Sequence, residues 1–200
     1  MTTILAVQGD TWAVIGSDSL VSDDNGRAYD LAPGVSKIAE KPGYIIATAG
    51  DLRAINIVCN AFDPPKPPKV FGPELDRFFT VTFIPALRET FESYGYATRN
   101  DKEQAAHGSS LIVAVRGTVY AVDEDYAWTR DRAGFYSAGS GGDYAIGAIN
   151  ALCDYSTSFL SIDLAEAYVE KSIEIATKLD TGSRLPARTK TQTLAPKETK

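Results

Sequence analysis

The sequence predicts an α+β fold in which two antiparallel sheets are covered by helices. Strand-like and helix-like segments come in blocks: two hairpins, two helices, a hairpin, then two helices. A parallel sheet would require strands and helices to alternate. Two stacked sheets with a helical layer on each outer side accommodate the observed order, and 200 residues suffice for one such domain.

Four apolar, β-branched runs predict the first two hairpins. These runs are residues 3–8, 11–16, 35–39 and 44–49. The first pair flanks the turn dipeptide Gly9-Asp10, and the second pair flanks Lys41-Pro42-Gly43. Residues 17–33 between the hairpins are polar and include the turn sequence Ser-Asp-Asp-Asn-Gly.

Two helices and a proline-rich connection are expected next. Residues 51–62 have helical periodicity, and residues 73–94 predict a long helix. Residues 63–70 carry four prolines and therefore predict a stiff surface connection. The apolar positions expected to be buried in the first helix are Leu52, Ile55, Ile57, Val58 and Cys59.

The second half of the chain predicts a third hairpin and two further helices. The hairpin comprises residues 110–116 and 119–122 around Gly117, and residues 136–140 lead into a glycine-rich turn. Helices are expected over residues 143–155 and 161–179, the latter capped by Ser161. The apolar positions of the last helix are Leu164, Ala165, Val169, Ile173 and Ile175.

The domain boundary is expected near residue 186. Residues 1–186 then form the domain, and residues 187–200 form a C-terminal tail with one short strand over residues 189–194.

Composition excludes several classes of function. The formal net charge of -6 argues against nucleic-acid binding, which requires a basic face. No apolar run approaches the length of a membrane span, and no basic segment precedes the first apolar run, so we expect a cytoplasmic protein without membrane contact. Cys59 and Cys153 lie in helix-like patterns and predict buried thiols. No spacing of cysteine or histidine indicates a metal, and no cofactor is expected.

The most informative feature is Thr2-Thr3 directly behind Met1. If Met1 is removed, Thr2 becomes N-terminal, and its α-amine can act as the base for its own hydroxyl. Removal is compatible with the small residue that follows Met1. A retained Met1 would convert the amine into an amide, which cannot accept a proton.

Three later positions supply other parts of such a site. Asp18 ends the second strand, and an antiparallel hairpin returns that end to the side of Thr2. Lys37 lies inside a strand-like run; pointing inward, it would need a carboxylate such as Asp18 and would place positive charge beside the threonine oxygen. Gly50 lies where a strand meets a helix, and its N–H is a candidate oxyanion donor.

Two turns in the second half complete the set. Ala138-Gly139-Ser140-Gly141-Gly142 presents Ser140 and backbone donors at a helix start. Asp180-Thr181-Gly182-Ser183 follows the last helix, where Asp180 and Ser183 can orient the amine through hydrogen bonds.

The order and approximate spacing of these positions over roughly residues 2–183 resemble the proteasome β-type subunit and the bacterial HslV-type ring peptidase. Both are N-terminal nucleophile (Ntn) hydrolases. The resemblance implies the four-layer αββα sandwich of the Ntn-hydrolase fold, threonine-dependent peptide-bond hydrolysis and a homo-oligomeric ring. It implies peptides or unfolded proteins as substrates and, by analogy alone, an AAA+ unfoldase as a partner.

The resemblance also implies a role for each matching position. Thr2 is nucleophile and base, Lys37 and Asp18 tune it, and Gly50 donates to the oxyanion. The residues that orient the amine are Ser140, Asp180 and Ser183. The chain departs from the family in a longer polar stretch between Asp18 and Lys37, the proline-rich connection and a short region after Ser183.

Two other functions remain open at this point. One is a catalytically silent ring component that retains Met1. The other is an Ntn amidase acting on small molecules in an open cleft. A serine–histidine–aspartate triad is not expected, because the single histidine, His107, lies in an irregular segment without a convincing serine elbow.

Overall fold

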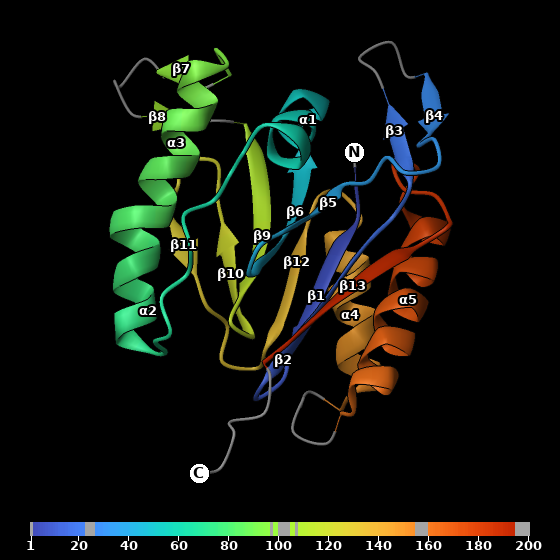
Figure 1. The fold of residues 1–200 in the computed structure, drawn as a ribbon. Coiled ribbons are helices and arrows are strands. Elements are labelled where there is room, and N and C mark those ends of the chain that lie inside the picture. Colours follow the sequence, from blue (N-terminus) through green and yellow to red (C-terminus); the bar gives the residue numbers. More distant parts are fainter. Residues whose placement is uncertain are drawn as a thin grey trace.

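The computed structural model describes residues 2–22, 27–96, 98–99, 105–106, 108–154 and 160–194. Two main sheets lie at the centre of the described chain, with helices on opposite sides of them (Figure 1). All pairings between described strands are antiparallel, which confirms the predicted class. His107 and the predicted end of the helix at residue 155 lie outside the described residues.

The first sheet has the order β12-β1-β2-β13 and the second β11-β10-β9-β6-β5. The first comprises β1 (Ile4–Gln8), β2 (Trp12–Ser17), β12 (Phe135–Ala138) and β13 (Arg188–Thr193). The second comprises β5 (Ile38–Lys41), β6 (Tyr44–Gly50), β9 (Ser109–Val115), β10 (Thr118–Val122) and β11 (Trp128–Thr129). Two short pairs accompany them: β3 (Leu20–Ser22) with β4 (Ala28–Asp30), and β7 (Thr98–Arg99) with β8 (Ala105–Ala106).

The three predicted hairpins are confirmed as β1–β2, β5–β6 and β9–β10. The last turns through Arg116 and Gly117, both with positive φ. One detail differs from the prediction. Because β5 begins at Ile38, Lys37 lies just before the strand instead of inside it.

Helices occupy the predicted blocks. They are α1 (Leu52–Asn60), α2 (Pro73–Phe78), a π-helical segment η1 (Phe79–Phe83), α3 (Ile84–Ser93), α4 (Gly142–Leu152) and α5 (Ile162–Leu179). The predicted helix over residues 73–94 is therefore continuous in direction but widened at η1. Ser161 caps α5 as expected, because its side chain accepts a hydrogen bond from the Leu164 N–H.

Two predicted core positions are wrong. Leu52 and Leu164 lie in the first turns of α1 and α5, where their side chains remain exposed. The two cysteines are free and half-buried, less enclosed than expected.

Three apolar clusters hold the elements together. The central cluster lies between the two sheets and includes Ile15 and Ile112. A second packs the other face of the β6–β9 sheet on α1, α2, η1 and α3, with Phe79 stacked on Tyr120. The third packs the other face of the β1–β2 sheet on α4 and α5 through residues such as Val169. Removing this much apolar surface from water is the main stabilising term of the fold.

The edge strand β13 pairs with β2 along its whole length, from Arg188 opposite Ser17 to Thr193 opposite Trp12. The chain therefore returns to the hairpin that begins the fold. The N-terminus lies at the same end of the molecule as α1 and the β3–β4 pair (Figure 1).

Candidate active site

Thr2 is buried at the start of β1, between the ends of two neighbouring strands. Ile4 lies opposite both Ser17 of β2 and Ala138 of β12, so the residues after these strands flank Thr2. The Gly141 N–H donates to the Thr2 carbonyl at 3.2 Å. Only 1% of Thr2 is exposed, so the residue is almost completely enclosed by the protein.

A buried ion pair faces the Thr2 hydroxyl. The Lys37 Nζ lies 2.6 Å from Asp18 Oδ1 and donates a hydrogen bond to Thr2 Oγ1 at 3.1 Å. Both charged side chains are almost completely enclosed. An ammonium at this position stabilises negative charge as it develops on the threonine oxygen.

Backbone donors hold the Asp18 carboxylate in place. Its Oδ1 accepts the Thr3 N–H at 2.9 Å, and its Oδ2 accepts the N–H groups of Leu20 at 2.9 Å and Arg184 at 3.1 Å. These three bonds fix the carboxylate, and through it the ammonium that points at Thr2.

Burial lowers the pKa of Lys37 below its ordinary value of 10.5. The charge of Asp18, its hydrogen bond and the more distant charge of Asp180 act in the opposite direction. Desolvation is the largest of these effects, so the ammonium holds its proton less firmly than a surface lysine.

A second network reaches the Thr2 nitrogen. The Thr2 N–H donates to Ser140 Oγ at 3.3 Å, and the Ser140 hydroxyl donates to Asp180 Oδ2 at 2.9 Å. Since the single Ser140 proton points at the carboxylate, its oxygen accepts from the Thr2 nitrogen. An N-terminal amine held by such a bond keeps its lone pair available for a proton from its own hydroxyl.

Ser183 was expected to orient the amine, and the structure places it beside Asp180 and Thr3. Its hydroxyl donates to Asp180 Oδ2 at 2.6 Å and lies 2.6 Å from Thr3 Oγ1. Consecutive side chains at the start of an extended segment point to opposite faces, so Thr3 meets Ser183 while Thr2 meets Lys37. Thr3 is therefore a member of the site that sequence reasoning missed, and its signal was the doubled threonine.

Gly50 is the last residue of β6. Its φ is +118°, and an added Cβ would lie 2.7 Å from Ser109 Oγ and 2.9 Å from the Gly108 carbonyl oxygen. Only glycine is compatible with this conformation and space. The Ser109 hydroxyl accepts the Asp51 N–H at 3.1 Å and lies 2.8 Å from the Tyr96 hydroxyl, which fixes the turn after Gly50.

Thr2, Lys37 and Gly50 line one small cleft of about 20 Å³. The remaining lining residues are Leu20, Val21, Ser22, Leu52 and Ile55. Half of the lining residues are therefore aliphatic, and the structure brings the candidate nucleophile, its ammonium partner and the candidate oxyanion donor to a common space.

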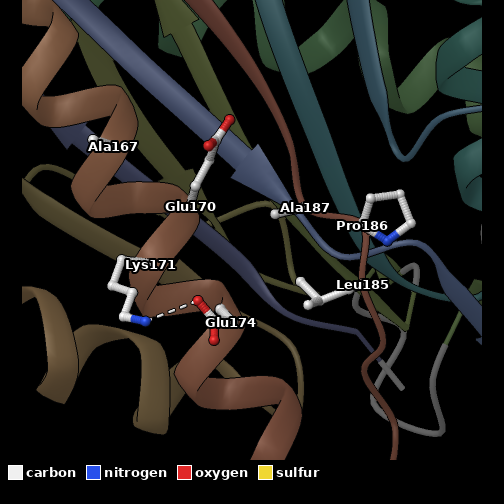
Figure 2. Close-up of a pocket in the computed structure, with 7 residues that line it drawn as sticks. All are labelled: Ala167, Glu170, Lys171, Glu174, Leu185, Pro186 and Ala187. Atoms are coloured by element: carbon white, nitrogen blue, oxygen red, sulfur yellow. Dashed lines mark hydrogen bonds and ion pairs between the residues drawn. The ribbon is translucent and has the colours of Figure 1, made fainter.

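A larger hollow of about 700 Å³ lies between α5 and residues 185–187 (Figure 2). It shares no lining residue with the Thr2 cleft. Its charged residues are Glu170, Lys171 and Glu174, and the last two form an ion pair at 2.9 Å. Because its lining has no hydroxyl or thiol side chain and its lysine is paired with Glu174, this hollow is not the candidate site of chemistry.

Within the described part of the chain, no group of three or more histidine, cysteine, aspartate or glutamate side chains is arranged to hold a metal ion. Among the same residues, no helix has the length and apolar character needed to cross a bilayer.

Comparisons with known proteins bear on the fold. No protein-family profile matches the chain, and no curated protein does. Several solved structures do match. BPH from Thiobacillus denitrificans aligns with a TM-score of 0.76 and 23% identity, covering 98% of this chain and all of that one. BPH in complex with epoxomicin aligns with a TM-score of 0.75 and 22% identity, again covering 98% of this chain and all of that one. HslV from Trypanosoma brucei aligns with a TM-score of 0.65 and 19% identity, covering 96% of this chain and all of that one.

These alignments extend over nearly the entire length of both partners, while the identities are low. The resemblance to HslV that the seven ordered positions predict is thus confirmed for the architecture. The chain has the fold of BPH and HslV.

Proposed function

We propose that this protein is a threonine peptidase of the N-terminal nucleophile type, active after removal of Met1. The observation that carries the proposal is the buried Lys37 ammonium, which lies 3.1 Å from Thr2 Oγ1 and 2.6 Å from Asp18. A cation beside a hydroxyl that acts as a nucleophile stabilises the negative charge that develops on the attacking oxygen. The match to BPH bound to epoxomicin and to HslV supports the same reaction class.

The proposed reaction begins when the Thr2 hydroxyl attacks the carbonyl carbon of an amide and its proton passes to the Thr2 amine. Lys37 stabilises the charge on the attacking oxygen, and the Gly50 N–H donates to the oxyanion. The amine then protonates the leaving nitrogen as the C–N bond breaks. Water, deprotonated by the same amine, hydrolyses the ester left on Thr2 and regenerates the hydroxyl.

The cleft suggests which peptides are cleaved fastest. Its aliphatic lining by Leu20, Val21, Leu52 and Ile55 favours a small, uncharged side chain beside the scissile bond. A charged side chain would lose its hydration there, and the one charged residue of the lining, Lys37, is already paired with Asp18 at 2.6 Å. We therefore propose peptides or unfolded proteins as substrates, with alanine or valine preferred at this position over lysine or glutamate.

The assembly completes the proposal. We infer a cytoplasmic homo-oligomeric ring of αββα sandwich subunits that encloses the sites, fed by an AAA+ unfoldase. The supporting observations are the near-complete alignment with HslV and the restricted cleft at Thr2.

Intact mass followed by fluorogenic-peptide turnover on the same sample tests the activity. We expect a mass lacking one methionine, turnover by that sample, and loss of turnover in Thr2→Ala. Thr11→Ala, at an exposed position in the β1–β2 turn, is the matched control and should retain full activity. Turnover that survives Thr2→Ala would refute the proposal.

The same sample separates the alternatives. Retained Met1 with no turnover would favour a silent ring component. A monomer or dimer that hydrolyses small amides but no peptides would favour an amidase. Light scattering supplies the oligomeric state.

A further inference from the structure

Thr3 links the two networks that meet at Thr2. Its backbone N–H donates to Asp18 Oδ1 at 2.9 Å, on the side of the Lys37 ammonium. Its hydroxyl lies 2.6 Å from Ser183 Oγ, on the side of Asp180. Thr3 has no exposed surface, so neither bond competes with water.

The direction of the hydroxyl bond follows from the carboxylate. Asp180 Oδ2 accepts from both Ser140 and Ser183, and each serine has only one hydroxyl proton. The Ser183 oxygen is thus the acceptor for the Thr3 hydroxyl. The bonds run from Thr3 through Ser183 to Asp180, and from the Thr2 nitrogen through Ser140 to the same carboxylate oxygen.

The backbone at Gly141 packs closely against the Thr3 hydroxyl, and the space between them is too small for a further side-chain atom. A Cβ added to Gly141 would lie 1.8 Å from Thr3 Oγ1, 3.0 Å from Asp180 Oδ2 and 3.1 Å from Ser183 Oγ. Gly141 also donates its N–H to the Thr2 carbonyl at 3.2 Å. The turn after β12 therefore encloses both the Thr3 hydroxyl and the backbone of Thr2.

We propose that Thr3 is a positioning residue for the reaction, whose hydroxyl fixes Ser183 and Asp180 so that Ser140 holds the Thr2 amine in the orientation that accepts the nucleophile's proton. This inference rests on the proposed function. It assigns a role to a residue next to the nucleophile that contacts neither the cleft nor Thr2 Oγ1.

The test compares Thr3→Val, which keeps the shape and removes the hydroxyl, with Thr3→Ser, which keeps the hydroxyl. The full chain is released with Thr2 at its N-terminus by cleavage of an N-terminal fusion, which makes Met1 removal equal in all variants. Loss of one oriented hydrogen bond predicts about a tenfold lower kcat for Thr3→Val with little change in KM. Thr3→Ser is expected within about twofold of the wild type.

Ser183→Ala and the double variant Thr3→Val/Ser183→Ala provide the second comparison. Because both side chains act through Asp180, the double variant should be no slower than the slower single variant. Multiplied losses would overturn the proposal, as would wild-type kcat in Thr3→Val. Equal losses in Thr3→Val and Thr3→Ser would also overturn it, because they would assign the effect to packing.

A pH titration of the Thr2 amine by NMR keeps this inference separate from the proposed activity. The pKa of the amine should fall in Thr3→Val, since the Ser140–Asp180 pair that favours its charged form is loosened, and should stay unchanged in Thr3→Ser. An inactive wild type with this titration pattern would refute the peptidase and retain the positioning role. Identical titrations in all variants would refute the positioning role.

Discussion

Replacing Lys37 with methionine removes the charge that the proposed reaction requires while keeping a side chain of similar length. The ammonium lies 3.1 Å from Thr2 Oγ1. At an effective dielectric constant of about 20, a unit charge at this distance stabilises a full negative charge by about 5 kcal/mol. An oxygen that carries about half a charge in the transition state would lose about 2–3 kcal/mol, or roughly a hundredfold in kcat.

The same substitution leaves the Asp18 carboxylate buried without its counter-ion. Removing one partner of a buried pair typically costs about 3–5 kcal/mol of folding free energy. Three backbone N–H groups still bind this carboxylate, so we expect a loss near the lower limit, about 3 kcal/mol. Urea unfolding measures it.

Both readouts are compared in protein that begins at Thr2, at a temperature where each variant is folded. Lys178→Met is the control, because that lysine is 63% exposed and, among the described residues, is paired with Glu174 alone. Its stability should change by no more than about 0.5 kcal/mol, with kcat unchanged. A folded Lys37→Met protein with kcat within about threefold of the wild type would refute the electrostatic role proposed for Lys37.

Further predictions concern glycines and pH. Gly141→Ala should lower stability by about 1–3 kcal/mol and abolish turnover, because its Cβ would overlap Thr3 Oγ1. Gly147→Ala, on α4 with no atom beyond its chain neighbours and its own helix backbone within 4 Å of the new Cβ, should instead stabilise the protein by about 0.5–1 kcal/mol in urea unfolding. Because the pKa of Lys37 is lowered, the unfolded chain binds more protons than the native one between that lowered pKa and 10.5. The contribution of Lys37 to the free energy of unfolding should therefore rise with pH across this window and be lost as pH falls through the native pKa. In the proposed reaction kcat should fall as pH rises, because the ammonium loses its proton. Lys37→Met should remove the Lys37-dependent part of the stability profile, and pH-dependent unfolding and kcat measurements check both trends.

Local patterns were sufficient to predict most elements of the fold. The turn at Gly9-Asp10 and the alternation around it predict β1–β2, and the Ser161 cap predicts the start of α5. The pairing of β12 with β1 and of β13 with β2 joins segments more than 100 residues apart. No local signal encodes such pairings. Exposure of Leu52 and Leu164 likewise depends on how the first turn of each helix meets its sheet.

The candidate site follows a similar division. Lys37, Asp18 and Thr2 are brought together, as expected from a hairpin that returns to the N-terminus. The partner of Ser183 could not be predicted, because it depends on which face of the chain each of two adjacent threonines presents. The hydrogen bond from the Asp51 N–H to Ser109 Oγ, which fixes the turn after Gly50, could not be predicted either. It depends on the pairing of β9 with β6, which local sequence does not encode.

The energetics of the Lys37–Asp18 pair favour a catalytic role over a silent one. Buried ion pairs are often no more stabilising than apolar residues of similar volume, because desolvation offsets the attraction. The lowered pKa of Lys37 reflects that desolvation. A subunit that served only to build a ring could fill this space with aliphatic side chains, as the nearby cleft wall does with Leu20 and Ile55. The ammonium instead points at the Thr2 hydroxyl. Once Met1 is removed, this hydroxyl differs from that of any other threonine because the same residue carries a free α-amine. In the proposed reaction the charge therefore has a use in nucleophilic attack that packing alone does not supply.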